Sequence, residues 1–372
     1  MYIVLTGAKK NVGDFLIRDR SLQLLKHLKP TEEFKEFNSW EPLDDKLDIV
    51  NQSKGIVICG GPGYKQDMYP NVYPLTKDLN DIKVPVYILG SGWYGVTGDQ
   101  EVMNNYKFTD SAKALLIKAA QNNGLSCRDY FTKRVVEMNG ITPINMTGCP
   151  VMYNLEYLNT GLRKPDEIKN IVFTTPQDPL YANQSIRLME SLRNEFKEAK
   201  IYASFHRGTG REEGTGLLEG IHLEKMAQEA SRLGLEVIDT SSDLSKIDFY
   251  SETDFHIGYR VHAHLYFLSE RKPSLLINED GRGTGFCNLL NLSGINAYKS
   301  NSIGNASVKF QNKWVKKGIN KSVGNFKAKY DISDEVISFM KEEFDNNFNR
   351  FNGIDEVIDG YFKNMKKFIE SI

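Results

Sequence analysis

Short apolar runs alternate with amphipathic stretches along most of the chain. In the first half, runs rich in β-branched residues at 2–6, 55–59 and 84–89 are predicted strands, and the stretches 14–28 and 111–122 are predicted helices. Strands that alternate with helices are typical of parallel sheets built from βαβ units. The first half of the chain is therefore predicted to form an α/β domain.

The second half repeats this alternation after a polar stretch. Residues 157–166 combine a glycine, a proline and several charges, which is typical of a connection between domains. Beyond it, the pattern predicts strands at 171–175, 201–204, 236–239, 255–257 and 274–277, and helices at 183–199, 219–233 and 262–271. We therefore expect a first α/β domain over residues 1–160 and a second over residues 161–330.

The C-terminal part of the chain has a different pattern. The alternation weakens into Ser, Asn and Lys over residues 297–329, and an amphipathic helix then begins at Ser333, with another after Gly353. We expect residues 331–372 to pack as helices across the two domains. A length of 372 residues agrees with two hydrophobic cores, at roughly 150 residues per domain. The predicted fold class is α/β, with two mostly parallel sheets.

Composition excludes several classes of protein. The net charge of -1 argues against a nucleic-acid partner, and no apolar run reaches the roughly 18 residues that would cross a bilayer. The cysteines form no CxxC pair, so neither a metal nor a redox site is expected. A cytoplasmic protein is predicted. The aromatic and lysine residues at 361–368 suit either a packed helix with a solvated face, which we favour, or peripheral contact with the inner membrane face.

Glycine-rich loops follow the predicted strands of the first half, where parallel sheets gather ligands. The candidates for ligand binding are Asn11, Gly13 and Asp14 in the first loop, Gly61 and Gly63 in the second, and Gly90 and Gly92 in the third. Asp14 suits a helix cap or a functional carboxylate equally well. Residues 90–95 match the dinucleotide pattern GxGxxG, but a tight turn is the favoured interpretation. Residues 60–63 are either a turn or a loop that faces a ligand.

Arg260 and His262 form the most informative pair. The segment runs from a strand through Gly258 into a helix, and both side chains fall at the helix start, where backbone donors and the helix dipole favour an anion. A structural ion pair for Arg260 and a half-buried core position for His262 are the alternatives. For His256 and His264 the core interpretation is favoured.

Two further loops of the second half carry charged candidates. Arg207 and Arg211 follow a strand among glycines, which suits a phosphorylated ligand, although a solvated loop is the more common meaning. Glu279 and Asp280 follow the strand after the Arg260 helix. They would offer acceptors to sugar hydroxyls, or they form a solvated acidic turn.

Several motifs occur in an order that resembles one family. They are Asn11-Val-Gly-Asp14, the glycine loop at 60–63, Gly90-Ser-Gly92, Ser126-Cys-Arg-Asp129 before a helix, Thr147-Gly-Cys-Pro150, and Gly258-Tyr-Arg-Val-His262. Over about residues 1–295 the sequence is similar to polysaccharide pyruvyl transferases. It departs from their pattern at Phe15, Pro62 and Cys149.

The resemblance implies a fold like that of GT-B glycosyltransferases, with two Rossmann-like halves that face a cleft. It implies transfer of a pyruvyl group from phosphoenolpyruvate to a sugar of a cell-envelope or exopolysaccharide precursor, which forms a ketal without metal or added cofactor. Arg260 and His262, with Gly258, would bind the donor together with Arg207 or Arg211. The acceptor would meet the first-domain loops and Glu279.

The residues suggest a mechanism with His262 as general acid and Arg260 on the donor anion. Two alternatives stay open: a nucleotide-sugar glycosyltransferase on the same two-domain plan, and a non-catalytic protein that binds a sugar phosphate. A lipid-linked acceptor and a homo-oligomer are compatible with the sequence, which specifies neither.

Overall fold

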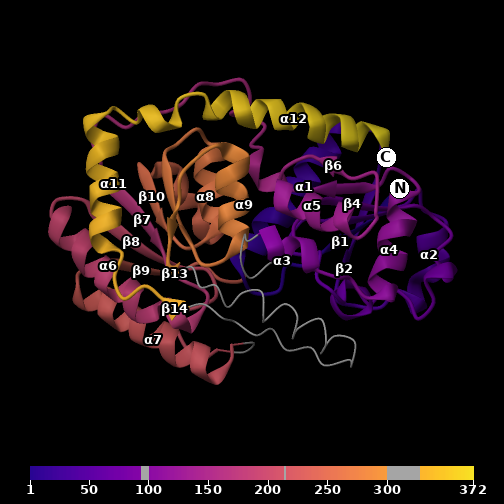
Figure 1. Ribbon diagram of the computed structural model, residues 1–372, viewed down its shortest axis with the longest axis horizontal. Coiled ribbons are helices and arrows are strands. Elements are labelled where there is room, and N and C mark those ends of the chain that lie inside the picture. The colour runs from indigo at the N-terminus through magenta and orange to yellow at the C-terminus, as the bar shows by residue number, and fades with distance from the viewer. Residues whose placement is uncertain (94–99, 213–214, 300–326) are drawn as a thin grey trace.

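Two α/β domains lie side by side in the computed structural model, which describes residues 1–93, 100–212, 215–299 and 327–372 (Figure 1). The first domain has a six-stranded sheet in the order β2-β1-β3-β4-β5-β6, and every pairing is parallel. Its strands are β1 (Tyr2–Thr6), β2 (Phe34–Asn38), β3 (Ile56–Cys59), β4 (Val86–Ser91), β5 (Leu125–Cys127) and β6 (Asn145–Met146).

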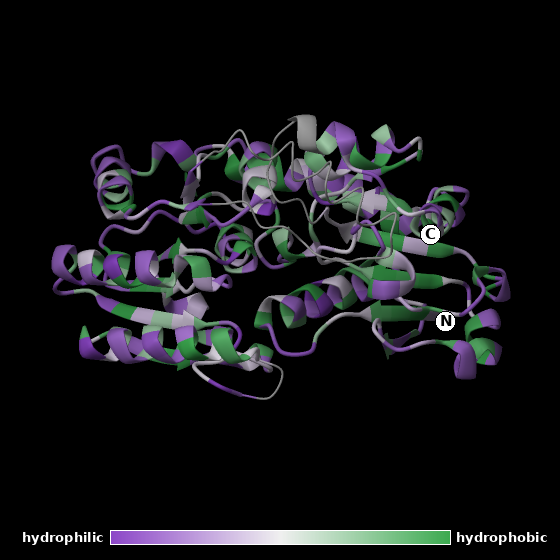
Figure 2. Cartoon of the chain, turned by 60° about the horizontal axis from the view of Figure 1, so that its bottom comes forward, coloured by the Kyte–Doolittle hydropathy of each residue, from purple (hydrophilic) through white to green (hydrophobic). Residues whose placement is uncertain are grey.

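Helices cover both faces of this sheet. They are α1 (Val12–Leu28), α2 (Leu47–Asn51), α3 (Gln100–Asn105), α4 (Asp110–Ala120) and α5 (Tyr130–Met138). The residues of β1, β3 and β4 are buried throughout, as expected for strands covered on both faces. The edge strand β2 is only half-buried. In Figure 2 hydrophobic residues run along the strands, and hydrophilic residues gather on the outer helices.

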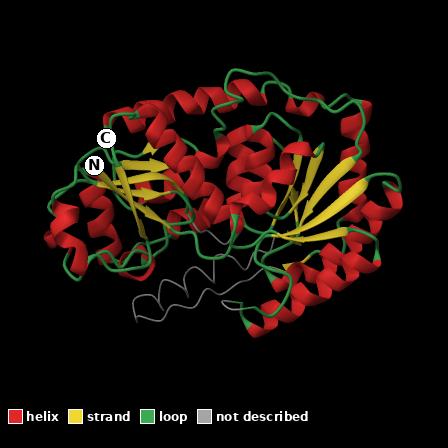
Figure 3. Ribbon diagram, turned by 180° about the vertical axis from the view of Figure 1, so that it is seen from behind, coloured by secondary structure: helices red, strands yellow, loops and turns green. Residues whose placement is uncertain are grey.

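The second domain repeats this architecture with the strand order β12-β11-β10-β7-β8-β9, again parallel. Figure 3 shows the two sheets, each flanked by helices. The elements are β7 (Asn170–Thr174), α6 (Ala182–Glu195), β8 (Lys200–Phe205), α7 (Leu217–Arg232), β9 (Glu236–Asp239), β10 (Phe255–Gly258), α8 (Val261–Ser269), β11 (Ser274–Asn278), α9 (Gly281–Leu290) and β12 (Ile295–Asn296). A short antiparallel pair, β13 (Tyr298–Lys299) and β14 (Lys327–Ala328), follows.

The C-terminal helices join the two domains. Helix α11 (Ser333–Asp345) packs on α6, and α12 (Ile354–Ser371) then runs back over both domains to end beside the N-terminus (Figure 1). On the first domain, the Tyr361 hydroxyl lies 2.9 Å from that of Tyr130. On the second, Asp359 forms a 2.5 Å ion pair with the buried Arg271. The predicted packing of these helices across the domains is confirmed.

The predicted α/β fold with two parallel sheets is also confirmed, and most element boundaries differ from the predicted ones by one or two residues. The pattern did not predict the short strands β5, β6 and β12 or the helices α2, α3 and α9. It also missed β2, which has the sequence Phe-Lys-Glu-Phe-Asn and lies at an edge, where hydrophobic alternation is weak. Most of the weakly patterned stretch, residues 300–326, lies outside the described residues.

Each sheet has a point where the order of its strands reverses. In the first domain this point lies between β1 and β3, and in the second between β7 and β10. Such switch points leave a crevice at the carboxyl ends of the strands, where open α/β sheets bind ligands. Asp14 lies in the first turn of α1, the helix that follows β1, and Arg260 lies in the loop after β10. The fold therefore places two sequence candidates at the two switch points.

Candidate functional site

A cavity of about 210 Å³ opens at the switch point of the second sheet and reaches the first domain. We call it the arginine cavity. Five basic and two acidic side chains line it, so it carries excess positive charge. Its lining residues are Asn11, Asp14, Pro62, Lys65, Arg128, Gln177, His206, Arg207, Tyr259, Arg260, Val261, His262, Glu279 and Arg282.

Arg260 links the two strands of the switch point. It is the N-cap of α8, two residues after the end of β10, and its Nε donates to the carbonyl oxygen of Thr175, which follows β7, at 2.8 Å. Its other nitrogens donate to the Pro176 carbonyl at 3.2 Å and to the Gln177 side chain at 3.4 Å. Among the described residues, no carboxylate lies within ion-pair distance of this guanidinium.

The charge of Arg260 is therefore held in place by neutral groups. Its side chain is only 5% exposed, and burial lowers its pKa to about 10, so the group is still a cation at neutral pH. A buried charge without a partner is costly. An anionic ligand would offset this cost, and the guanidinium is already oriented to receive one.

His262 is the second residue of the same helix and contacts Gly13 of the first domain. Its Nε2 is buried and has no hydrogen-bond partner among the described residues. Burial, followed by the charges of Arg128, Arg282 and Arg260, lowers its pKa to about 3. The imidazole is therefore neutral at neutral pH, and an anion in the cavity would favour its protonation.

The two arginines predicted after β8 have different positions. Arg207 lines the arginine cavity and pairs with Glu219 at 2.7 Å. Arg211 does not line it, and its side chain is 58% exposed and pairs with Glu224 at 3.4 Å. Of the two arginines predicted to bind the donor, only Arg207 therefore lies in the same cavity as Arg260 and His262. Arg211 lies on the outer surface, where it pairs with Glu224 of α7.

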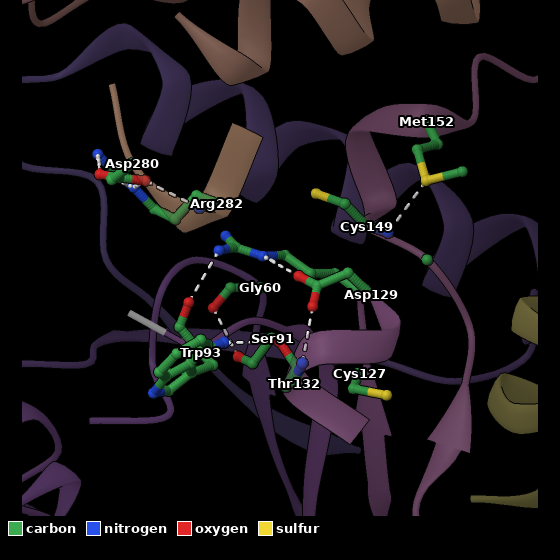
Figure 4. Close-up of polar contacts among 12 residues, drawn as sticks. Gly60, Ser91, Trp93, Cys127, Asp129, Thr132, Cys149, Met152, Asp280 and Arg282 are labelled. Atoms are coloured by element: carbon green, nitrogen blue, oxygen red, sulfur yellow. Dashed lines mark hydrogen bonds and ion pairs between the residues drawn. The ribbon is translucent and has the colours of Figure 1, made fainter. Parts of the chain in front are cut away.

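Arg128 enters the cavity from the first domain, and sequence analysis did not select it as a site residue. It is 1% exposed, and its Nε donates to Asp129 at 3.1 Å and its Nη2 to the Trp93 carbonyl at 3.2 Å. Figure 4 shows Asp129 and Trp93 of this domain opposite the Asp280–Arg282 ion pair of the second, which measures 2.7 Å. The motif that contains Arg128, Ser126-Cys-Arg-Asp129, is recognisable in the sequence, but only the tertiary structure shows that Arg128 lines the cavity.

Glu279 lies in the arginine cavity rather than beside the first-domain glycine loops. Its Oε1 accepts hydrogen bonds from the backbone N–H groups of Gln177 and Asp178, at 2.8 and 3.1 Å. Burial raises its pKa to about 7. These hydrogen bonds fix the loop after β7, and carbonyl groups of the same loop accept hydrogen bonds from Arg260.

A second cavity, also of about 210 Å³, opens at the switch point of the first sheet. We call it the glycine-loop cavity. It is lined by Gly60, Gly61 and Gly63, as well as by Lys9, Trp40 and Tyr73. Asp14, Pro62 and Lys65 line both cavities, so the two are contiguous. Burial raises the pKa of Asp14 to about 6, against the lowering effect of the Asn11 side chain and nearby arginines.

The remaining glycine candidates serve close packing. Gly90 and Gly92 line neither cavity, and a Cβ on Gly92 would lie 1.8 Å from the Arg128 Nε. Gly92 therefore makes room for Arg128, and the acceptor role of this loop stays a prediction. Gly258, at the end of β10, also lies outside the lining, as does Gly13, which contacts His262. Gly95 lies outside the described residues.

The other histidines of the basic segment belong to the core. His256 bonds Thr174 at 2.9 Å and Ser274 at 2.7 Å, and His264 bonds Ser274 at 2.7 Å. Neither lines a cavity described above. Across the described ranges, no cluster of three His, Cys, Asp or Glu side chains could hold a metal ion. No helix in these same ranges is long and apolar enough to cross a bilayer.

Comparison with known proteins gives one family. The sequence model described as "Polysaccharide pyruvyl transferase" matches residues 11–281. No curated protein matches the chain.

Among solved structures, MnaA of S. aureus with UDP is 11% identical, with 93% of this chain and 97% of that chain covered and a TM-score of 0.45. UDP-GlcNAc 2-epimerase of Neisseria meningitidis with UDP-GlcNAc is 9% identical, with 92% of this chain and 100% of that chain covered and a TM-score of 0.47. Anabaena Alr3699/HepE with UDP and glucose is 10% identical, with 100% of both chains covered and a TM-score of 0.43.

Proposed function

The chain belongs to the polysaccharide pyruvyl transferase family, and from this premise we propose that it transfers a pyruvyl group from phosphoenolpyruvate to a saccharide precursor. The product would be a ketal that bridges two sugar hydroxyls, with phosphate released. The acceptor would belong to a cell-envelope or exopolysaccharide precursor.

The observation that carries this proposal is the Arg260 guanidinium, which is buried, positively charged and held only by neutral acceptors. Phosphoenolpyruvate has a carboxylate and a phosphate close together, so a donor of this kind needs several cations in a small space. Arg128, Arg207 and Arg282 line the same cavity. The first turn of α8 adds free backbone N–H groups and the positive end of its dipole.

We propose that His262 delivers the proton to the enol carbon. Its neutral state without ligand suits this role, because an entering anion raises the pKa of a neighbouring histidine. Proton transfer by a positioned side chain contributes typically about 10²–10⁴-fold to a rate. Protonation of the enol carbon leaves cationic character on the neighbouring carbon, which the acceptor hydroxyls then attack.

The acceptor sugar would occupy the glycine-loop cavity. The two cavities share Asp14, Pro62 and Lys65, so a donor in one and an acceptor in the other would meet beside these residues. The half-buried Asp14 carboxylate could accept a hydrogen bond from an attacking hydroxyl there. In this arrangement each domain binds one substrate at its own switch point.

The test is an incubation with phosphoenolpyruvate and a panel of lipid-linked and nucleotide-linked saccharides. Release of phosphate together with a pyruvyl mass gain on one saccharide is expected. Hydrolysis or transfer from a nucleotide sugar without phosphoenolpyruvate would instead identify a glycosyltransferase. The Arg260→Ala variant should lose phosphoenolpyruvate binding in calorimetry, and unchanged binding would refute the proposed donor site.

A further inference from the structure

His206 is the second histidine of the arginine cavity, and the mechanism above does not use it. It follows β8 directly, its side chain is 2% exposed, and it lines the cavity together with Arg260 and His262. Its backbone carbonyl also accepts from the Val12 N–H of the first domain at 3.2 Å. The residue therefore has a fixed position at the boundary of the two domains.

A chain of buried hydroxyl groups orients the His206 ring. Its Nε2 lies 2.9 Å from the Tyr250 hydroxyl, which lies 2.6 Å from the Ser204 Oγ, and Ser204 contacts the Thr240 hydroxyl at 3.2 Å. The ring also stacks on Tyr250, at 6.4 Å between centroids. Buried polar networks of this kind restrict a side chain to one orientation.

Ketal formation from phosphoenolpyruvate requires two proton deliveries. Two sugar hydroxyls form C–O bonds and lose two protons, while the bond from the donor carbon to the bridging oxygen of the phosphate breaks. One proton ends on the enol carbon, which becomes a methyl group, and the other ends on the departing phosphate. Departure as a fully deprotonated phosphate would be slow, so an acid beside the bridging oxygen is advantageous.

We propose that His206 is this second proton donor, which protonates the phosphate as its bond to carbon breaks, while His262 serves the enol carbon. This inference rests on the proposed function. Of the histidines in the described ranges, only these two line the arginine cavity. The two rings provide one proton carrier for each of the two deliveries.

The surroundings of His206 explain how its charge would respond to the donor. Burial comes first among the causes that hold its pKa well below the usual value, followed by the charges of Arg260, His256 and His262. The Tyr250 hydroxyl, which is also ionisable, contacts the ring. The unliganded ring is therefore neutral, and a donor that brings both carboxylate and phosphate charge would reverse the balance and draw in a proton.

Proton uptake during phosphoenolpyruvate binding tests this inference without any knowledge of the acceptor. Calorimetry at pH 6.5 in buffers of different ionisation enthalpy gives the number of protons taken up. The His206→Gln variant, which keeps an amide next to Tyr250, should take up measurably fewer protons than the wild type, because the ring that gains a proton when the donor binds is absent. Tyr250→Phe should give an intermediate loss.

His222→Gln is the matched control, because this histidine of α7 does not line the cavity, and its proton uptake should equal that of the wild type. Equal uptake by wild type and His206→Gln would overturn the assignment. So would a variant that melts like the wild type but no longer binds phosphoenolpyruvate, since His206 would then be a binding residue. If the wild type itself does not bind phosphoenolpyruvate, the proposed function fails first. Should His206→Gln not fold, the Tyr250→Phe result decides.

Discussion

Gly13 of the first domain packs directly against His262 of the second, so a Cβ on Gly13 would lie 2.7 Å from the His262 Nδ1. Real Cβ atoms do not approach so closely, and the ring would have to move. The missing side chain at position 13 therefore fixes how closely α1 approaches the proposed general acid. This contact also explains a glycine that sequence analysis assigned to acceptor binding.

Substitution of Gly13 by alanine should lower the rate of phosphate release about 10- to 100-fold, because a displacement of about 1 Å at a reacting group can cost this much. Stability should change less than activity, because the higher helix propensity of alanine offsets part of the cost of moving the ring. Steady-state assays and thermal melts would separate the two effects. Gly161→Ala is the control, because no atom lies within 4 Å of a Cβ there.

Arg207 and Arg211 offer a matched pair of substitutions on one loop. Arg207→Gln should weaken phosphoenolpyruvate binding about tenfold or more, as expected for loss of a hydrogen bond to a charged group. Arg211→Gln should change the Kd less than about twofold, because its side chain lies outside the cavity and exposed ion pairs contribute little. Calorimetric titration of both variants checks this, and equal effects would contradict the assignment.

Asp14→Asn should change the pH dependence of stability. Burial raises the pKa of Asp14 from its usual 3.8 to about 6, so the folded protein binds more protons than the unfolded chain between these values. The contribution of Asp14 to stability therefore decreases as pH rises through this window. The variant should melt above the wild type at pH 7.5 and lose this advantage near pH 4. Asp19→Asn, on the outer face of α1, is the control, and a pH-independent difference would refute the prediction.

The ion pair between Arg271 and Asp359 should stabilise the packing of α12. Asp359→Ala would leave the buried Arg271 without its carboxylate, at a cost of about 3 kcal/mol in the free energy of unfolding. Lys366→Ala on the same helix removes only an exposed pair with Glu370 and should cost less than about 0.5 kcal/mol. Urea unfolding measures both, and equal values would show that the pair does not anchor the helix.

The sequence by itself determined the fold class. Hydrophobic periodicity is a local property, and it located the longer strands and helices of both domains and the two C-terminal helices to within a few residues, but not several short strands and helices. Arg260 and His262 could also be selected from the sequence, because the start of a helix after a strand has the same chemistry in any parallel sheet. The edge strand β2 escaped prediction because its burial, and hence its pattern, is weak.

Only the tertiary structure decided which of the candidates meet. Arg128 and His206 lie in different domains, more than 75 positions apart, and no local pattern relates either of them to Arg260. No local pattern separates Arg207 in the cavity from Arg211, which pairs with Glu224 of α7 on the surface. Nor does a local pattern show that position 92 must be glycine because the Arg128 side chain packs against it. Periodicity specifies elements, whereas a site between two domains depends on how their switch points face each other.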